Sequence, residues 1–206
     1  MRKNLFIAFE GIDGSGKSTQ VKLLAKKLEE TGHKVYVTCE PTDGPIGVMI
    51  RNIFKGAMPA DHRTIAALFA ADRLEHILDK TNGLLKKLEE GYTIVTDRYY
   101  FSSYAYHSVH TEMDWVIETN RLSAELLRPD LNVFIDISPE TGMKRIAAGR
   151  NSVELYETLD NLQQVKAKYT EAMDRLKAQE KIATVNGERT PEVIAEDVWN
   201  VVSQLS

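Results

Sequence analysis

The chain alternates short, uninterrupted apolar runs with longer stretches in which apolar residues recur every three or four positions. Short continuous runs are typical of strands buried on both faces, and the longer spacing is typical of helices that bury one side. Strands that alternate with such helices predict an α/β fold with a parallel sheet covered by helices on both faces. The expected strands span residues 5–9, 35–39, 93–96, 132–137 and 182–185.

Helices are expected in the connections between these strands. The first has its apolar residues on one side and is expected to end at Gly32. Asn82-Gly83 favours a turn and predicts an interruption within a long helical stretch. In the longest helix, Leu155 and Leu159 begin an apolar stripe that continues to Leu176. The expected helices span about residues 21–32, 46–54, 64–88 with that interruption, 101–109, 115–127, 139–148, 155–179 and 190–205.

Composition narrows the function classes. The 206 residues are 43% hydrophobic and 27% charged, which indicates a folded chain of one domain, residues 1–206. A formal net charge of -4 argues against general binding to nucleic acid or anionic membranes, so an anionic ligand must be met by local groups. No apolar run approaches membrane-spanning length, and the single cysteine, Cys39, has no internal partner. We therefore expect a cytoplasmic protein and interpret Cys39 as a packing residue.

The first expected strand leads into residues 11–18, GIDGSGKS, which fit the phosphate-loop pattern G-x-x-x-x-G-K-S. Glycines let such a loop wrap so that backbone N–H groups point at phosphate oxygens, and the following helix directs its positive end at the same anion. A glycine-rich turn that binds nothing is the alternative, and the strand before and helix after argue against it. The residues expected to hold ATP phosphates are Gly11, Asp13, Gly14, Ser15, Gly16, Lys17, Ser18 and Thr19.

Charged residues also follow the other expected strands. Glu40 and Pro41 follow the second strand, and Asp97 and Arg98 follow the third. Ligands of parallel α/β sheets bind outside the carboxyl ends of the strands, so these residues stand where a ligand would be. An aspartate at a strand end near a phosphate loop is typical of the Mg²⁺ site that serves nucleotide phosphates. We assign this metal to Asp97 and the Ser18 hydroxyl.

Arginines are informative because phosphoryl transfer needs two phosphates held in line and their charge spread over cations. A single arginine on a helix is more often a solvated surface residue, so each depends on its context. Five arginines lie near strand ends or the expected lid, namely Arg51, Arg73, Arg98, Arg145 and Arg150.

Four segments supply that context, and together they resemble the thymidylate kinase family of phosphate-loop nucleoside monophosphate kinases. They are FEGIDGSGKSTQ at 9–20, EPT at 40–42 followed by IG and IR up to residue 51, LFAADR at 68–73, and DRY at 97–99 followed by SS and AY up to residue 106. The resemblance implies a five-stranded parallel sheet with a short lid at about residues 145–157. It also implies transfer of the γ-phosphoryl group of ATP to dTMP, giving dTDP and ADP, with Mg²⁺ as cofactor.

The resemblance further implies a role for each matched residue. Arg73 hydrogen-bonds the thymine edge and Phe69 stacks on its ring, although a core position for Phe69 is a reasonable alternative. Asp13 meets the sugar 3'-hydroxyl, and Tyr106 crowds the 2' position. Arg51 and Arg98 clamp the acceptor phosphate. The expected dTMP residues are Asp13, Pro41, Arg51, Phe69, Arg73, Arg98, Ser103 and Tyr106, and the expected catalytic residues are Lys17, Asp97, Arg98 and Arg150.

Some positions depart from the family pattern or stay open. Cys39 stands where many members have arginine, and the loop itself lacks the arginine found in one branch, so the missing charge is expected from Arg150 or, second, Arg145. Glu10 and Glu40 could orient an arginine or a metal-bound water, or cap the sheet. We interpret His76 and His107 as surface or packing residues. The family resemblance also implies a homodimer paired through helices.

Two other functions remain possible at this point. One is a kinase for another deoxynucleotide or nucleoside on the same scaffold. The other is a nucleotide-dependent switch or binding module, which would need a guanine-reading N-K-x-D motif or a basic face, and the sequence has neither.

Overall fold

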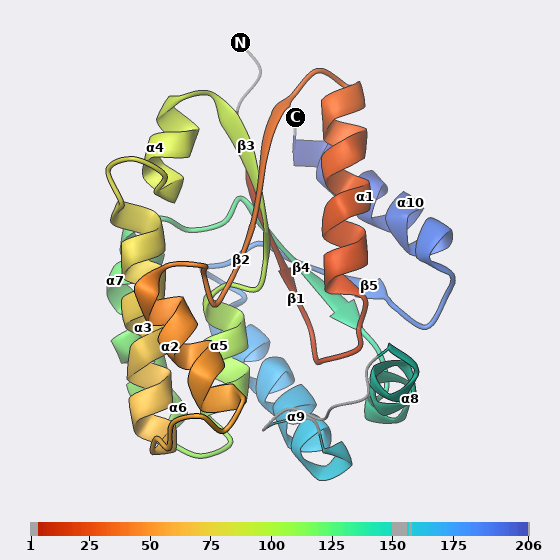
Figure 1. Ribbon diagram of the computed structural model, residues 1–206. Coiled ribbons are helices and arrows are strands. Elements are labelled where there is room, and N and C mark those ends of the chain that lie inside the picture. Colours follow the sequence, from red (N-terminus) through yellow and green to blue (C-terminus); the bar gives the residue numbers. More distant parts are fainter. Residues whose placement is uncertain (1–3, 150–155, 157, 206) are drawn as a thin grey trace.

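The computed structural model describes residues 4–149, 156 and 158–205. Its five strands form one sheet in the order β2-β3-β1-β4-β5, and every neighbouring pair is parallel (Figure 1). The fold class expected from the sequence is thereby confirmed. The strands are β1 (Phe6–Glu10), β2 (Lys34–Cys39), β3 (Tyr92–Asp97), β4 (Leu131–Asp136) and β5 (Ile182–Asn186).

Helices cover both faces of the sheet. α1 (Lys17–Glu30) and α10 (Pro191–Val202) lie on one face, and α3 (His62–Leu78), α5 (Tyr100–His107) and α9 (Leu159–Leu176) lie on the other (Figure 1). Among the described residues, no helix has the length and apolar character needed to cross a membrane. The remaining helices are α2 (Pro45–Phe54), α4 (Leu84–Glu89), α6 (Met113–Thr119), α7 (Arg121–Leu126), α8 (Pro139–Gly149) and the short η1 (Ser203–Leu205).

Strand β1 separates two hydrophobic cores. Successive side chains of a strand point to opposite faces, so Ile7 and Phe9 join the core beneath α1 and α10. Phe6 and Ala8 join the core shared with α5 and α9. All four side chains are at most 1% exposed, which is why this central strand reads as a continuous apolar run.

The parallel register brings the chemically important residues to one edge of the sheet. Phe9 pairs with Asp97, Cys39 pairs with the same Asp97, and Glu10 pairs with Phe134. The carboxyl ends of β1, β2 and β3 therefore lie side by side. The phosphate loop and the segments after β2 and β3 leave the sheet together at this edge.

The long helical stretch predicted over 64–88 is interrupted as expected. Asp79 ends α3, and its carboxylate accepts hydrogen bonds from the backbone N–H groups of Thr81 and Asn82. α3 begins two residues before Thr64 because the Asp61 side chain caps its N-terminus by accepting from the Arg63 N–H.

The single helix predicted over 115–127 is wrong, because the structure has α6 and α7 with a break at Asn120. The Asn120 side chain is 1% exposed, donates to the Val116 carbonyl and accepts a hydrogen bond from Arg73. Asparagine side chains compete with the backbone for helix hydrogen bonds, which explains a break at this position. The interruption thus serves a buried polar contact that the helical periodicity does not reveal.

The helix predicted over 155–179 is shorter than expected. α9 begins at Leu159, after the Thr158 hydroxyl accepts from the Asn161 N–H. Leu162 is fully buried, but Leu159 is 41% exposed and does not belong to the apolar stripe as predicted. Leu155 lies outside the described residues, as does most of the predicted lid. The last α-helix ends at Val202 rather than Leu205.

Candidate functional site

The loop between β1 and α1 has a backbone that only glycine adopts without strain. Gly11, Gly14 and Gly16 have φ angles of 141°, 77° and 92°. A Cβ atom on Gly14 would lie 2.5 Å from the carbonyl oxygen of Gly142, a contact that no side chain tolerates. The loop therefore wraps closely against the start of α8. This conformation is typical of a cradle of backbone N–H groups for phosphate.

Lys17 lies inside this loop rather than in solvent. Its Nζ donates to the carbonyl oxygens of Gly11 and Ile12, both at 3.0 Å, and the side chain is 6% exposed. Burial, together with the nearby positive charge of Arg98, lowers the pKa of Lys17 to about 8. An anionic phosphate beside Nζ would favour the protonated form again.

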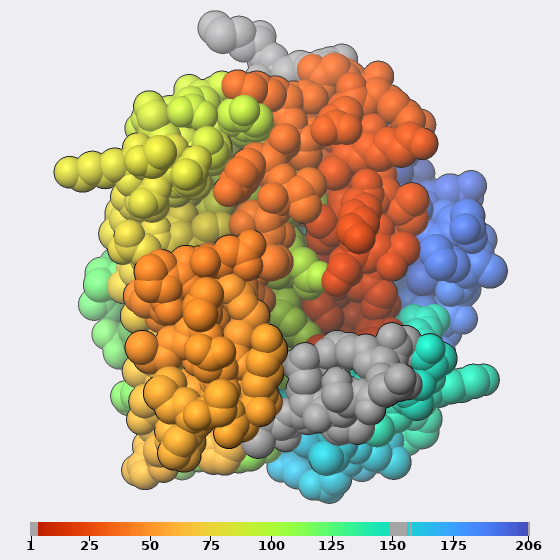
Figure 2. Space-filling view, in the orientation of Figure 1, coloured from red at the N-terminus to blue at the C-terminus, as the bar shows by residue number. Residues whose placement is uncertain are grey.

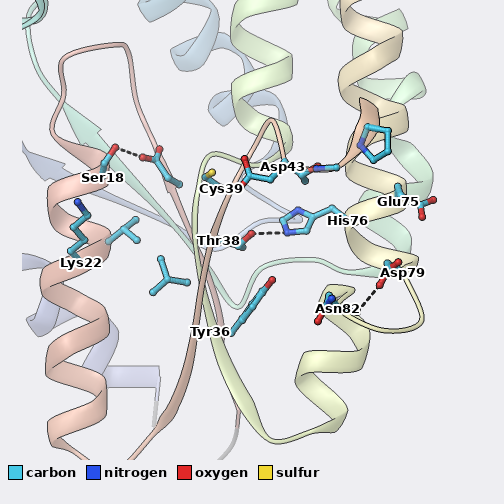
Figure 3. Close-up of a pocket in the computed structure, with 16 residues that line it drawn as sticks. Ser18, Lys22, Tyr36, Thr38, Cys39, Asp43, Glu75, His76, Asp79 and Asn82 are labelled. Carbon is cyan, nitrogen blue, oxygen red and sulfur yellow. Dashed lines mark hydrogen bonds between the residues drawn. The ribbon is translucent and has the colours of Figure 1, made fainter. Parts of the chain in front are cut away.

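The side chains of Ser18 and Asp97 meet at the N-terminal end of α1. The Ser18 hydroxyl donates a hydrogen bond to the Asp97 carboxylate (dashed in Figure 3), although the two residues are far apart in sequence. Asp97 comes from the carboxyl end of β3, and Thr19 lies one residue further along α1, exposed. Two oxygen donors beside a phosphate loop are the ligand type that Mg²⁺ prefers.

Arg98 lies at the centre of the site. It has a φ of 73°, in the left-handed region that is uncommon for residues other than glycine, and its N–H donates to the Phe9 carbonyl. One guanidinium nitrogen lies 2.5 Å from Asp13, and the other donates to Ser102 at 3.0 Å and to Gly11 of the loop at 3.4 Å. Burial works to lower the pKa of Arg98, but Tyr106 and Asp13 outweigh it and hold that pKa well above its usual value.

Asp13 in the loop and Tyr106 on α5 form two hydrogen bonds with each other. The Tyr106 hydroxyl donates to the Asp13 carboxylate at 2.9 Å and accepts from the Asp13 N–H at 3.0 Å. Burial works to raise the pKa of Asp13, but Arg98 and Lys17 lower it further than burial raises it. The carboxylate is therefore charged and balances the guanidinium of Arg98.

Glu10, at the end of β1, accepts hydrogen bonds from residues that contact Arg98 or lie next to it in the chain. Its carboxylate accepts from Ser102 at 2.6 Å, from the Tyr169 hydroxyl at 3.0 Å and from the Tyr99 N–H at 2.9 Å. Burial raises the pKa of Glu10, although these hydrogen bonds and the charge of Arg98 oppose the rise. Of the roles left open for Glu10, these contacts support positioning of Arg98 through Ser102.

A cavity of about 310 Å³, here called the inner cavity, opens next to Arg98. Figure 2 shows the hollow between the orange surface around α2 and the red surface of α1, with green residues after β3 at its floor. One part of its wall carries charge and the other carries aromatic rings and small polar groups. The structure places seven of the eight residues predicted for dTMP around it, namely Asp13, Pro41, Arg51, Phe69, Arg98, Ser103 and Tyr106.

Arg51 reaches the inner cavity from α2. Its guanidinium forms an ion pair with Asp43 at 3.1 Å and donates to the Pro41 carbonyl at 2.9 Å. The Asp43 side chain is fully exposed, so this ion pair is weak and easily exchanged for another anion. Arg51 can therefore turn to a phosphate at little cost.

Arg73 is the predicted dTMP residue that does not line the inner cavity. Its side chain is 1% exposed and forms a buried ion pair with Glu40 at 2.7 Å. It also donates to Ser103 at 3.1 Å and to Asn120. Glu40 and Ser103 do line the cavity, so Arg73 lies behind the wall and holds two wall residues in place. Its predicted contact with the thymine edge stays a prediction.

Several wall residues were not predicted from the sequence. His107, interpreted as a surface or packing residue, is 3% exposed and lines the inner cavity. It lies one helical turn after Ser103 on α5, and this spacing of four residues was the signal that could have identified it. Phe54 and Tyr156 close the wall, with ring centroids 5.5 Å apart. Neither carries a motif in the sequence.

His76 is also no free surface residue. Its ring nitrogens lie 3.1 Å from Glu40 and 2.9 Å from the Thr38 hydroxyl. Glu40 thus binds Arg73 on one side and His76 on the other. Of the roles left open for Glu40, this arrangement supports orientation of an arginine.

A second and larger cavity of about 700 Å³, here called the edge cavity, lies over β2 between α1 and α3 (Figure 3). Among the described residues, its charged lining is mostly acidic, with Asp43, Glu75, Asp79 and Asp97 against one lysine, Lys22. Such a wall disfavours a phosphate ester. The smaller inner cavity, with two arginines, is therefore the better anion site.

Cys39 lies at the rim of both cavities. Its interpretation as a packing residue is wrong, because the residue is exposed at the end of edge strand β2. Burial of part of the thiol, with Asp97 and Asp43 nearby, raises the pKa of Cys39 and favours the neutral form.

Arg145 approaches the phosphate loop from α8. Its guanidinium donates to the Gly187 carbonyl at 2.9 Å and to the Gly14 carbonyl at 3.4 Å. Arg145 is thus near the donor side of the site. Arg150, the preferred lid arginine, lies outside the described residues.

Comparison with known proteins gives one consistent family. The family model described as "Thymidylate kinase" matches residues 9–198. The chain is 36% identical to a probable thymidylate kinase of Thermococcus gammatolerans, over 97% of this chain and 96% of that protein. It is 37% identical to a thymidylate kinase of Caldicellulosiruptor saccharolyticus, over 98% of both chains. It is also 40% identical to a probable thymidylate kinase of Methanococcus aeolicus, over 81% of this chain and 78% of that protein.

Proposed function

The chain belongs to the thymidylate kinase family, and on this premise we propose how its residues transfer a phosphoryl group from ATP to dTMP. The reaction is that of a dTMP kinase, in which the dTMP phosphate attacks the γ-phosphorus of ATP and dTDP and ADP leave. Such a reaction needs no protein nucleophile. The protein contributes by aligning the two nucleotides and by stabilising the charge that spreads over the phosphate oxygens.

ATP phosphates bind in the loop between β1 and α1. The backbone N–H groups of residues 11–19 and the N-terminal end of α1 supply the donors. Lys17 leaves its loop carbonyls and moves its ammonium group to the outer phosphates. Arg145 lies on the same side and supports the bound nucleotide, and Arg150 is kept as the arginine that a closing lid would add.

The residues at the loop fit a magnesium ion. Ser18 and Asp97 offer oxygen ligands, and the described residues hold no cluster of three or more His, Cys, Asp or Glu that could enclose a metal alone. A site of this type suits an ion held mainly by phosphates and water. Bound Mg²⁺ would neutralise charge on the ATP phosphates, with Ser18 and Asp97 as its protein ligands.

The acceptor dTMP lies in the inner cavity with its phosphate toward Arg98 and Arg51. Arg98 contacts both the loop carbonyl of Gly11 and the cavity, so its guanidinium stands between donor and acceptor phosphates. Phosphate oxygens compete with Asp13 for this guanidinium, and Asp13 then turns to the sugar hydroxyl. The base lies against Phe69 at the other part of the wall.

One observation carries this assignment: two arginines and an aromatic wall face one cavity that adjoins the phosphate loop. The test is a panel of acceptors offered with Mg-ATP, comprising dTMP, dUMP, dCMP, dGMP and thymidine. We expect the highest kcat/KM for dTMP and no ATP hydrolysis without an acceptor. A clear preference for another acceptor, or hydrolysis that no acceptor changes, would contradict the assignment.

We also propose a homodimer that pairs through helices. Leu78 at the end of α3 is 50% exposed, and Leu122 and Leu126 on the neighbouring α7 are 51% and 43% exposed. Exposed leucines on adjacent helices favour an interface. Sedimentation velocity should give a dimer for the wild type and a monomer for a Leu122→Glu/Leu126→Glu variant, and a wild-type monomer would contradict the proposal.

The remaining features of the enzyme are proposed from the reaction itself. We keep residues 1–206 as a single kinase domain with a lid at about 145–157, which would exclude water during transfer. We place the enzyme in the cytoplasm, where ATP and deoxynucleotides are available.

A further inference from the structure

A short segment between β2 and α2, residues 40–44, separates the two cavities. Its first two residues line the inner cavity, and its last three line the edge cavity. The segment forms neither helix nor strand, so its position depends on the side chains of other elements. The side chains that hold it therefore determine part of the shape of the inner cavity.

Asp72, on α3, is a buried acid that holds this segment. It is 2% exposed, and both of its carboxylate oxygens accept hydrogen bonds from Thr42. One oxygen accepts from the Thr42 N–H at 2.7 Å and the other accepts from the Thr42 hydroxyl at 2.6 Å. Burying a carboxylate is costly unless hydrogen bonds replace its water. Asp72 has no part in the phosphoryl transfer proposed above, yet it fixes both the backbone and the side chain of Thr42.

The next residue of α3 holds the same segment on the other side of Pro41. Arg73 forms its buried ion pair with Glu40 at 2.7 Å, so two consecutive residues of α3 bind the two chain neighbours of Pro41. The Pro41 carbonyl accepts a hydrogen bond from Arg51 at 2.9 Å. Because the segment is held on both sides, Pro41 offers Arg51 an acceptor at a fixed position.

Thr42 also fixes the start of α2, the helix that carries Arg51. The Thr42 hydroxyl accepts from the N–H of Gly44, the residue before α2, at 3.1 Å. A Cβ atom on Gly47 would lie 1.9 Å from the Thr42 carbonyl oxygen, so the first turn of α2 lies directly against the Thr42 backbone. α2 and α3 lie side by side (Figure 1). The position of Arg51 therefore depends on Thr42 in two ways, through the start of its helix and through the Pro41 carbonyl.

We propose that Asp72 is a positioning residue that acts through Thr42 to hold Arg51 toward the acceptor phosphate. This inference rests on the proposed function, which takes Arg51 as a phosphate ligand. A guanidinium that is held in place before binding loses less conformational entropy when it meets a phosphate. Without Asp72, Arg51 keeps its charge but loses this preorganisation. The affinity should then fall for ligands that carry a phosphate and stay unchanged for those that do not.

The ligand pair dTMP and thymidine tests the proposal, because the two differ only in the phosphate. Calorimetric titration of the full chain without ATP gives the affinity for dTMP, and competition against dTMP gives the affinity for thymidine. We expect Asp72→Ala to weaken dTMP binding about tenfold, roughly the effect of losing one charge-assisted hydrogen bond. The affinity for thymidine should stay within about twofold of that of wild type.

A double-mutant cycle with Arg51 separates positioning from other roles. Arg51→Ala alone should weaken dTMP binding on the order of 30-fold, because it removes the guanidinium itself. Adding Asp72→Ala to this variant should weaken binding by less than about twofold, since no guanidinium is left to position. A further tenfold loss would show that Asp72 acts by another route, and would overturn the proposal.

Two variants of Thr42 test the same contact if Asp72→Ala does not fold. Thr42→Val removes the hydroxyl and should weaken dTMP binding about threefold, whereas Thr42→Ser keeps the hydroxyl and should bind as wild type does. Asp79→Ala is the matched control, because Asp79 ends the same helix and its carboxylate also accepts from backbone N–H groups, those of Thr81 and Asn82. It should lower the urea midpoint and leave the ratio of dTMP affinity to thymidine affinity unchanged.

The outcomes separate the two proposals. A wild-type protein that neither binds nor phosphorylates dTMP overturns the proposed function and this inference with it. Wild-type dTMP binding that Asp72→Ala and Thr42→Val leave unchanged overturns only the role of Asp72. An equal loss for dTMP and for thymidine would show that Asp72 only maintains the fold, and would also overturn its role.

Discussion

The phosphate loop and the inner cavity adjoin each other, yet they are built in different ways. The loop is one continuous segment, residues 11–19, whose function depends on backbone conformation and on glycines with positive φ angles. The inner cavity is assembled from the end of β2, from α2, α3 and α5, from Tyr156, and from Asp13 of the loop and Arg98 after β3. Its shape depends on buried side-chain contacts such as Arg73 with Glu40.

Substitutions in the loop and substitutions behind the inner cavity should therefore have different effects. A change in the loop should damage catalysis and ATP binding while the fold persists, because few core contacts depend on its side chains. A change behind the inner cavity should damage the fold and dTMP binding together, because charges there are paired away from water. Variants can therefore assign an effect to one region or the other.

The largest effect is expected from breaking the ion pair behind the cavity. Arg73→Ala removes the cationic partner of the buried Glu40 carboxylate and leaves it only the contact with His76, which should lower the free energy of unfolding by about 3–5 kcal/mol. Urea denaturation measures this change. Because the loss comes from an uncompensated charge, Arg73→Ala/Glu40→Gln should recover a large part of it. Equal stability of the single and double variants would contradict this explanation.

Lys17→Met tests the loop side of the comparison. The variant removes the ammonium group that meets the outer phosphates, so kcat should fall on the order of 10²–10³-fold. The affinity for dTMP and the urea midpoint should remain near those of wild type, as calorimetry and denaturation would show. A matching loss of dTMP affinity would mean that the two regions are not separable.

Two glycines of the loop form a matched pair. A Cβ on Gly14 would collide with the Gly142 backbone at 2.5 Å, whereas a Cβ on Gly16 meets nothing within 4 Å although both positions have positive φ. Gly14→Ala should therefore weaken ATP binding by about 1–3 kcal/mol, which raises the KM for ATP. Gly16→Ala should weaken ATP binding by less. A larger defect for Gly16→Ala would argue against backbone contact with α8 as the cause.

The smallest effect concerns pH and the aromatic wall. His107 has a folded pKa of about 3 against an ordinary 6.5, so the unfolded chain takes up a proton that the folded chain refuses as pH falls below 6.5. The free energy of unfolding that depends on the neutral His107 is therefore fully present above pH 6.5 and falls as the pH falls below 6.5. Between pH 6.5 and 4.5 wild type should lose about 2 kcal/mol more than His107→Phe. Parallel urea titrations of both proteins measure the difference, and identical pH profiles would contradict a buried neutral histidine.

The loop and the inner cavity could be predicted from the sequence to different extents. The loop could be identified from residues 11–18 alone, because its chemistry depends on neighbouring backbone groups. The cavity residues came mostly from the family resemblance, and the contacts of Arg73 could not be foreseen, since they join four segments that are distant in the chain. The break at Asn120 was missed for the same reason, as its side chain serves Arg73 rather than its own helix.

The solvent exposure of single side chains could not be predicted reliably from the sequence. Cys39 and Leu159 occupy positions that fit an apolar pattern but lie at the surface, and the sequence left open whether His107 is a surface or a packing residue, whereas the structure buries it. Burial at such positions is decided by which elements pack over them. The fold class followed from periodicity, which depends on many residues at once, whereas the strand order was not predicted.

A crystal structure with adenosine and thymidine joined through their 5' ends by a pentaphosphate tests the central claim most directly. We predict adenosine phosphates in the loop beside Lys17, and the thymine ring in the inner cavity against Phe69. A thymidine bound in the edge cavity beside Tyr36 and Glu75, or a thymine ring that does not enter the inner cavity, would contradict this prediction.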